Sequence, residues 1–178
     1  MILGIINFNM ELIIIAAVAK NNAIGYKGKL LYEIPEDLKR FKELTWGYPI
    51  IMGKSTYKSL PKQPLPGRRN LVLASDPIED WENLKDCEIY FSKEGILNAV
   101  KNSPKAFIIG GGITYSSFLD RADTLELTEI DAYPDNFDTI FPEFSSEDFR
   151  EVRREQHIQE ETGLRYSFVR YERNLPIL

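Results

Sequence analysis

Residues 106–122 read AFIIGGGITYSSFLDRA, and the order of elements they predict indicates the fold class. It opens with four apolar residues, continues with three glycines and ends in a pattern of helical period. A short apolar run rich in isoleucine is typical of a buried strand, and the pattern over 114–122 predicts a helix. A strand, a glycine turn and a helix in this order indicate an α/β protein.

The same alternation recurs along the chain. Other short apolar runs bounded by turn residues predict strands at 12–19, 49–52, 70–74, 88–91, 124–128 and 166–173. Helical patterns lie between several of them, at 35–44, 56–60 and 94–102. We therefore expect a largely parallel sheet with helices on both faces. Near the C-terminus, 149–159 and 164–173 bracket Glu161-Thr162-Gly163, which predicts an antiparallel hairpin at the sheet edge.

Composition and charge narrow the class of protein. The 178 residues are 43% apolar and 28% charged, which suits one domain that folds without disulfides or structural metals. The net charge of -5, without a block of like charges, argues against a nucleic-acid partner. Cys87 is the only cysteine and His157 the only histidine, so we expect neither a disulfide nor a metal site. This cysteine usage favours a cytoplasmic setting.

The N-terminus is apolar but does not read as a signal peptide or a membrane span. It has no basic start, Asn7, Asn9 and Glu11 interrupt it, and the unbroken run over 12–19 is too short to cross a bilayer. We expect residues 1–10 to be an extension of unknown role, 11–174 to be the domain and 175–178 to be a tail.

The glycine turn is the first candidate binding site. Gly110, Gly111 and Gly112 leave the backbone open to a ligand, and the start of the following helix favours a phosphate. The dinucleotide fingerprint G-x-G-x-x-G is absent, because Tyr115 stands at the position of its third glycine. A tight turn without a ligand is an equally good explanation.

The helical segment IPEDLKRFKEL, residues 34–44, holds the candidate catalytic carboxylate. Asp37, Phe41 and Leu44 fall at i, i+4 and i+7, so the carboxylate shares a face with two large apolar side chains. Such surroundings raise the pKa of a carboxyl and suit it to a cationic or amidine-like ligand edge. The alternative is a surface carboxylate that stabilises the positive end of the helix.

Two further segments carry cations near expected strands. Gly53-Lys54-Ser55-Thr56 resembles half of a phosphate-binding loop, but Tyr48 stands where the complete motif requires a glycine. A phosphate site and a plain helix cap both remain open. Arg68 follows a Pro66-Gly67 turn and either binds a carboxylate or is simply solvated.

Taken together and in this order, these segments resemble dihydrofolate reductase from about Leu12 to about Arg173. The matching blocks are 15–19, 23–25, 34–38, 41–42, 49–53, 65–70, 109–112 and 127–131. The resemblance implies an eight-stranded, mainly parallel sheet with an antiparallel C-terminal edge, a folate pocket and an extended NADPH groove.

The resemblance also implies an activity. The family reduces 7,8-dihydrofolate to 5,6,7,8-tetrahydrofolate in one-carbon metabolism, by hydride transfer from NADPH to pterin C6 with protonation of N5. Asp37 resembles the pocket carboxylate that binds the pterin 2-amino and N3 groups, and Thr128 the threonine that shares its hydrogen bonds. Dihydrofolate and antifolate-type ligands are the expected partners. The resemblance implies a monomer, and we expect the protein to bind neither nucleic acid nor a membrane.

The remaining roles follow from the same resemblance. The residues expected to contact substrate are Ile15, Ala17, Leu38, Phe41, Leu60, Arg68, Ile109 and Tyr115, with Arg68 on the glutamate α-carboxylate. Those expected to contact cofactor are Ala17, Ile24, Gly25, Gly53, Lys54, Ser55, Thr56, Ala74, Ser75, Gly110, Gly111, Gly112, Ile113, Thr114 and Tyr115. Residues 24–31 correspond to the mobile loop that closes over nicotinamide.

Two positions depart from the family pattern. Tyr32 stands where a tryptophan is usual, and we expect its phenol to donate to a pocket water as a third catalytic residue. Ile113 stands where some relatives carry a basic residue, which leaves the preference for NADPH over NADH open. The alternatives are a reductase of this fold acting on another heterocycle and, less favoured, a non-catalytic ligand-binding protein.

Overall fold

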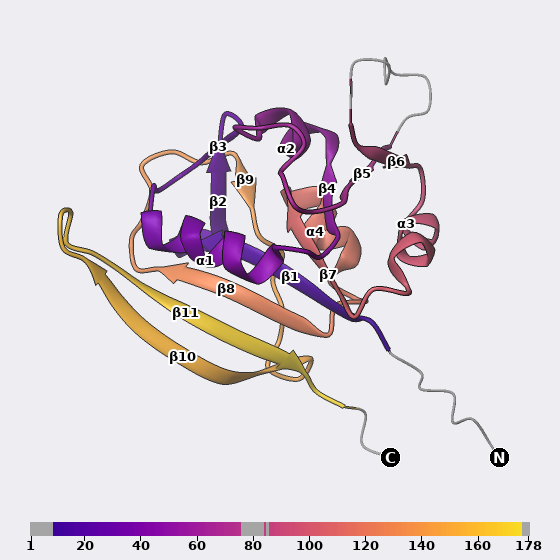
Figure 1. Ribbon diagram of the computed structural model, residues 1–178. Coiled ribbons are helices and arrows are strands. Elements are labelled where there is room, and N and C mark those ends of the chain that lie inside the picture. The colour runs from indigo at the N-terminus through magenta and orange to yellow at the C-terminus, as the bar shows by residue number, and fades with distance from the viewer. Residues whose placement is uncertain (1–8, 76–83, 85, 176–178) are drawn as a thin grey trace.

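The computed structural model describes residues 9–75, 84 and 86–175, and within them an eight-stranded sheet forms the centre (Figure 1). Its strands are β1 (Glu11–Val18), β4 (Ile50–Gly53), β5 (Asn70–Leu73), β6 (Glu88–Tyr90), β7 (Lys105–Gly110), β8 (Thr124–Ile130), β10 (Phe149–Gln159) and β11 (Leu164–Arg173). Their order is β10-β11-β8-β1-β7-β4-β5-β6. Pairing is parallel from β8 to β6 and antiparallel at β11 and β10, which confirms the predicted fold class.

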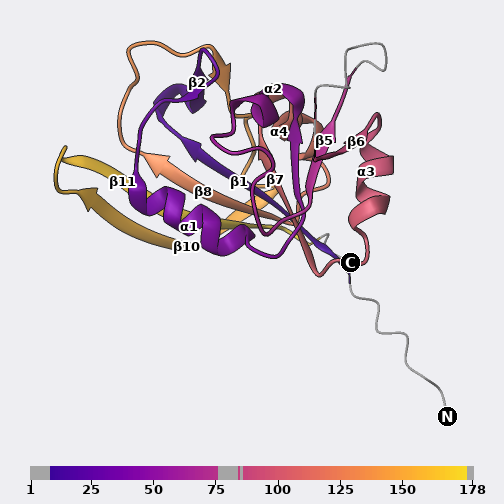
Figure 2. The same cartoon turned by 45° about the horizontal axis from the view of Figure 1, so that its top comes forward.

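The helices are α1 (Pro35–Thr45), α2 (Lys54–Ser59), α3 (Lys93–Val100) and α4 (Gly112–Phe118), with a 3₁₀ turn at Lys20–Asn22. Figures 1 and 2 show α1 lying across the face of β8, whereas α3 lies beside β6. Residues 1–8 of the expected extension and 176–178 of the expected tail lie outside the described residues. No helix within the described ranges is both long and apolar enough to cross a membrane.

Several helix boundaries differ from the predicted ones, and two of the differences bear on the site. Helix α2 begins at Lys54 and not at Thr56, so Lys54 and Ser55 belong to its first turn. Helix α4 ends at Phe118 and not at Ala122. Beyond this end, the Arg173 guanidinium of β11 donates to the carbonyls of the C-cap residue Leu119 and of Ala122 at 2.5 and 2.7 Å. A side chain that binds the last carbonyls of a helix stabilises its C-terminus.

A second, three-stranded sheet was not predicted. It consists of β2 (Ala23–Tyr26), β3 (Lys29–Leu30) and β9 (Thr139–Ile140), all antiparallel. The turn between β2 and β3 has positive φ at Lys27 and Gly28, as the common two-residue hairpin turn requires. The segment expected to be a mobile loop is therefore largely a hairpin, held to β9 by the bond from the Lys27 N–H to Asp138 Oδ2 at 2.8 Å.

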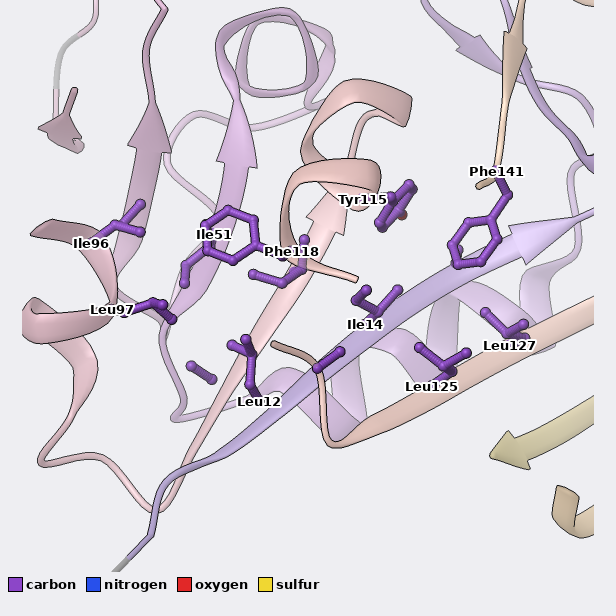
Figure 3. Packing of buried hydrophobic residues seen from close by; sticks show 14 of the residues in the cluster. Leu12, Ile14, Ile51, Ile96, Leu97, Tyr115, Phe118, Leu125, Leu127 and Phe141 are labelled. Carbon is purple, nitrogen blue, oxygen red and sulfur yellow. The ribbon is translucent and has the colours of Figure 1, made fainter. Parts of the chain in front are cut away.

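The apolar core lies on both faces of the sheet, because successive side chains of a strand point to opposite faces. Leu12 and Ile14 of β1 point toward α3 and α4, where Phe118 is fully buried (Figure 3). Ile13 and Ile15 point the other way, into a cluster that includes Phe41 and Leu44 of α1 and Tyr57 of α2. The sheet is thus covered by helices on both faces.

Strand β8 follows the same alternation with one difference. Leu125 and Leu127 join the apolar cluster under α4 (Figure 3), whereas Thr124, Glu126 and Thr128 lie in the face toward α1. All three polar residues are buried. Buried polar groups need partners, and α1 supplies Arg40 to Glu126 and Asp37 to Thr128, whereas Thr124 donates to Glu11 of β1.

Candidate active site

Glycines end two neighbouring strands at one edge of the sheet. Gly53 is the last residue of β4 and Gly110 is the last of β7, and Met52 pairs with Gly110 in the parallel register. Next to them β5 ends before Ala74, which is buried, and Ser75, which is exposed. In open α/β sheets the carboxyl ends of the strands are where ligands bind.

The backbone at this edge packs too tightly for side chains. A Cβ on Gly53 would lie 2.9 Å from Thr114 Oγ1, and one on Gly112 would lie 2.9 Å from the Ile140 carbonyl oxygen. Gly110 has a φ of 135°, which side-chain-bearing residues rarely adopt, and the Gly110–Gly111 peptide bond is cis. The starts of α2 and α4 are therefore brought together around a backbone without side chains.

The residues expected to bind the cofactor surround this glycine edge. Lys54, Ser55 and Thr56 form the first turn of α2, and Ile113 and Thr114 lie in the first turn of α4. Ile113 is 90% exposed, whereas Thr114 is buried. The first N–H groups of a helix have no partner within it, so the start of α4 combines free donors with an open approach.

Asp37 lies away from the glycine edge, at the start of α1, where this helix crosses β8. Pro35 opens α1, which places Asp37 in the first turn, and the Thr128 hydroxyl of β8 donates a hydrogen bond to Asp37 Oδ1. Phe41 and Leu44 pack into the apolar cluster on the same side of the sheet. The helix face predicted from the i, i+4, i+7 spacing is confirmed.

The electrostatic setting of Asp37 favours a carboxyl that can exchange a proton. Burial raises its pKa above the ordinary value, while the hydrogen bond from Thr128 and the charge of Arg40 lower it in part. The carboxyl is therefore easier to protonate than one in water. The alternative of a plain surface carboxylate is not supported, because the side chain has a buried hydrogen-bond partner.

Several of the residues expected to contact substrate belong to one apolar cluster on the α1 side of the sheet. Ile15, Phe41, Leu60 and Ile109 belong to one cluster, and the Ile15 carbonyl accepts a hydrogen bond from the Tyr115 hydroxyl at 2.8 Å. Ala17 packs with Tyr32 in a separate cluster. Leu38 is 46% exposed, so of the residues expected to contact substrate it is the one that faces solvent.

Arg68 is held in place by the chain around it. Its guanidinium donates to Thr45 Oγ1 at 3.0 Å and to the Pro66 carbonyl at 2.9 Å, and it lies 5.5 Å from the Trp46 ring. The fork is therefore oriented before any ligand arrives. Gly67 permits this arrangement, since a Cβ there would lie 2.5 Å from the Trp46 ring.

Comparisons with known proteins agree with this geometry. A family model described as dihydrofolate reductase matches residues 11–173. The dihydrofolate reductase type 3 of Salmonella typhimurium is 40% identical over 148 residues, which cover 83% of this chain and 88% of that protein. The Neisseria gonorrhoeae dihydrofolate reductase is 36% identical over 162 residues, which cover 91% of this chain and 98% of that protein. This chain belongs to the dihydrofolate reductase family.

A solved structure supports the same assignment. The Enterococcus faecalis dihydrofolate reductase, complexed with NADP(H) and RAB-propyl, superposes with a TM-score of 0.84 at 28% identity. The match covers 93% of this chain and 97% of that one. The departures noted above are therefore departures within the dihydrofolate reductase family.

Tyr32, at the usual tryptophan position of the dihydrofolate reductase family, is partly buried and packs against the cluster that includes Ile34 and Tyr166. Burial raises the pKa of its phenol, and the nearby carboxylate of Asp135 raises it further. The hydroxyl therefore keeps its proton at neutral pH and can act as a donor. Its role toward a pocket water remains a prediction.

Sequence reasoning missed the charged side chains behind this dihydrofolate reductase pocket. Arg40 of α1, Glu126 of β8 and Arg170 of β11 form ion pairs next to Asp37. A signal was present, because Arg40 follows Asp37 by three residues and Glu126 precedes Thr128 by two. Either spacing places both members of a pair on the same face of their element.

Proposed function

We propose that Asp37 and Thr128 form the substrate-binding and proton-handling pair with which this dihydrofolate reductase family member reduces 7,8-dihydrofolate to 5,6,7,8-tetrahydrofolate, using NADPH. The observation that carries the proposal is the hydrogen bond from Thr128 to a partly buried Asp37 on the sheet face that leads to the glycine edge.

Asp37 suits the 2-amino and N3 edge of a pterin. A carboxylate can accept two parallel hydrogen bonds from such an amidine-like edge, which fixes both the position and the orientation of the ring. Thr128 occupies Oδ1 from the sheet side and so holds the carboxyl plane. The raised pKa of Asp37 also lets this group support proton delivery toward N5.

The glycine edge suits the cofactor. Gly110 to Gly112 offer backbone N–H groups at the start of α4, and the space that a side chain would fill at Gly111 is bounded by Thr56 Oγ1, 3.3 Å from its Cβ position. Lys54, Ser55 and Ser75 would contact the adenosine 2′-phosphate, and Ala17, Ile24, Gly25 and Ala74 would contact the rest of the cofactor. When bound, NADPH supplies the hydride that reaches pterin C6.

Arg68 would bind the glutamate α-carboxylate of the substrate. Its guanidinium is already oriented by Thr45 and Pro66, so little side-chain freedom is lost when a carboxylate binds. Ile15, Phe41, Leu60 and Ile109 would exclude water around the pterin and the aminobenzoyl ring. Antifolates with a diaminopyrimidine edge would use Asp37 in the same way as the pterin.

The proposal extends to three further properties. Residues 11–174 would act as one domain, since the family match over 11–173 lies within them. The enzyme would be a monomer, as expected for the family, and cytoplasmic, where a chain with one cysteine needs no disulfide.

The test is the loss of NADPH absorbance on mixing with dihydrofolate, with NADH run in parallel. We expect rapid oxidation of NADPH by the native chain and a fall of at least about a hundredfold in kcat for Asp37→Asn at neutral pH. Binding of NADPH without turnover in the native chain would contradict the proposed activity. Equal turnover in Asp37→Asn would contradict the role of the carboxylate.

A further inference from the structure

A charged network lies directly behind Asp37, on the same face of the sheet. Arg40 Nη2 contacts Glu126 Oε2 at 2.5 Å, and Glu126 Oε1 contacts Arg170 Nη1 at 2.7 Å. Arg170 Nη2 also contacts Glu11 Oε1 at 2.8 Å. Glu126 is buried, with 7% of its side chain exposed, and each of its two carboxylate oxygens is paired with an arginine.

The sheet register explains why these groups meet. Thr128 pairs with Phe168, and Glu126 pairs with Arg170, across the antiparallel β8–β11 ladder. The guanidinium of Arg40 lies 4.6 Å from the centroid of the Phe168 ring. Arg40 therefore packs against Phe168, the cross-strand partner of Thr128, and forms an ion pair with Glu126.

We propose that Arg40 is a positioning residue of the active site, which Glu126 and Arg170 hold as a fixed cation beside the Asp37 carboxyl. The inference rests on the proposed role of Asp37 and adds to it. Arg40 and Asp37 lie three residues apart in α1, so both side chains project toward the β8 face. Because Arg40 is ion-paired with Glu126, and Glu126 with Arg170, the Arg40 guanidinium stays beside the Asp37 carboxyl through the catalytic cycle.

Other groups also face Asp37 from the elements packed around it. Thr128 of β8 donates to it, and burial holds the Tyr115 phenol of α4 neutral, with the charge of Asp37 adding to this. The Tyr166 phenol of β11 donates to Glu36, the neighbour of Asp37, and His157 Nδ1 of β10 lies 3.7 Å from Glu36 Oε1.

Among these groups Arg40 is the formal positive charge whose attraction lowers the pKa of Asp37. Glu36 brings a negative charge close by but engages Tyr166, on the side of α1 toward β10 and β11. Arg40 thereby opposes the effect of burial, which alone would keep the proton on Asp37 over a wider range of pH. The balance of burial against the Thr128 hydrogen bond and the Arg40 charge sets the pH at which the carboxyl can exchange its proton.

The effect on the rate has a defined sign. Each turnover takes up one proton as well as one hydride, so hydride transfer slows once the pH exceeds the pKa that governs protonation. Removal of Arg40 raises that pKa, and the variant should keep its rate to higher pH. A purely structural role for Arg40 would lower the rate at every pH by the same factor.

The experiment compares three variants of the full chain with the native protein. Arg40→Met removes the charge but keeps an unbranched stem, and Glu126 then still has Arg170 as a partner. Arg40→Lys retains the charge. Lys39→Met is the matched control, because it removes one charge from the same helix at a side chain that is 77% exposed.

Two measurements are made on each. The titration of Asp37 is followed in ligand-free protein by NMR of ¹³C-labelled aspartate carboxyls, with Asp37→Asn to identify the signal. Hydride transfer is followed in a single turnover across the same pH range. For Arg40→Met we expect the Asp37 midpoint to move to higher pH and the alkaline rate, relative to its acidic plateau, to rise by at least roughly threefold. Arg40→Lys should restore both, and Lys39→Met should change neither.

The outcomes separate this inference from the proposed function. An unmoved Asp37 midpoint in folded Arg40→Met overturns the inference, while the role of Asp37 stands. A midpoint that moves without any change in the pH dependence of hydride transfer overturns the proton-handling role itself. If Arg40→Met does not fold, Arg40→Gln takes its place, because it removes the charge but keeps a hydrogen-bond donor for Glu126, and its Asp37 midpoint must rise for the inference to hold.

Discussion

Asp37→Asn should make the ligand-free protein more stable at neutral pH, although it removes the proposed catalytic group. Burial is the largest influence on the pKa of Asp37 and raises it, and the hydrogen bond from Thr128 and the charge of Arg40 compensate only in part. The folded protein therefore disfavours the ionised carboxyl. Asparagine has nearly the same shape, carries no charge at any pH and still offers an oxygen to the Thr128 hydroxyl.

The magnitude follows from two opposing changes. A hydrogen bond to a charged group contributes about 1.5–3 kcal/mol and one between neutral groups about 0.5–1.5, so the Thr128 bond weakens by roughly 1 kcal/mol. The desolvation cost that disappears is larger than this loss, because the net effect of the site is to raise the pKa. We expect a gain of about 0.5–2 kcal/mol in unfolding free energy, as found when strained active sites are relieved.

The gain should depend on pH. A carboxyl whose pKa is raised by folding contributes stability that is fully present below its unfolded pKa, about 3.9, and is lost as the pH rises through its folded pKa. As the pH rises, the native protein loses this contribution to its unfolding free energy, whereas Asp37→Asn has no carboxyl to ionise and keeps its stability. The advantage of Asp37→Asn should thus be small near pH 4 and grow toward neutral pH.

Urea unfolding followed by circular dichroism, at a series of pH values from 4 to 8, measures this difference. Glu43→Gln is the control, because Glu43 lies on α1 with 65% of its side chain exposed and only a 4.0 Å contact to Lys39. A native protein more stable than Asp37→Asn at neutral pH, or a stability difference that does not vary with pH, would contradict this prediction.

Three further substitutions test other parts of the site. Tyr32→Phe should slow hydride transfer severalfold at neutral pH, and equal single-turnover rates would exclude the phenol as a donor. Gly67→Ala should destabilise the fold by about 1–3 kcal/mol in thermal or urea unfolding, because the new methyl meets the Trp46 ring at 2.5 Å and the φ is +73°. Arg68→Lys should raise KM for dihydrofolate about tenfold or more with kcat little changed, since lysine lacks the fork that Thr45 orients; an unchanged KM would remove Arg68 from the substrate site.

The sheet and the carboxylate helix could be predicted because their signals are local. The apolar runs that became β1, β4, β7 and β8 are short and bounded by turn residues, which is the pattern that burial on both faces produces. The predicted i, i+4, i+7 face of α1 is confirmed because Phe41 and Leu44 pack on the sheet. Asp37 lies on the same helix face and is therefore turned toward the sheet as well.

The rest required contacts between distant residues. Asp37 meets Thr128 across 91 residues, and Arg40 meets Glu126 across 86, so both depend on where α1 crosses β8. Strand β9 has two residues, too few for any periodicity, yet it approaches the glycine turn so closely that a side chain at Gly112 would contact the Ile140 carbonyl. Neither spacing nor composition encodes such a crossing.

The role of Asp37 in proton delivery is tested by the rate of a single hydride transfer in Asp37→Asn across a range of pH. If Asp37 supports protonation of N5, the rate should collapse at neutral pH and recover steadily as the pH falls, because the solvent then supplies the proton. The native protein should instead reach a plateau below the pKa of the carboxyl. A variant that transfers hydride at the native rate at neutral pH, with the native pH dependence, would contradict the account.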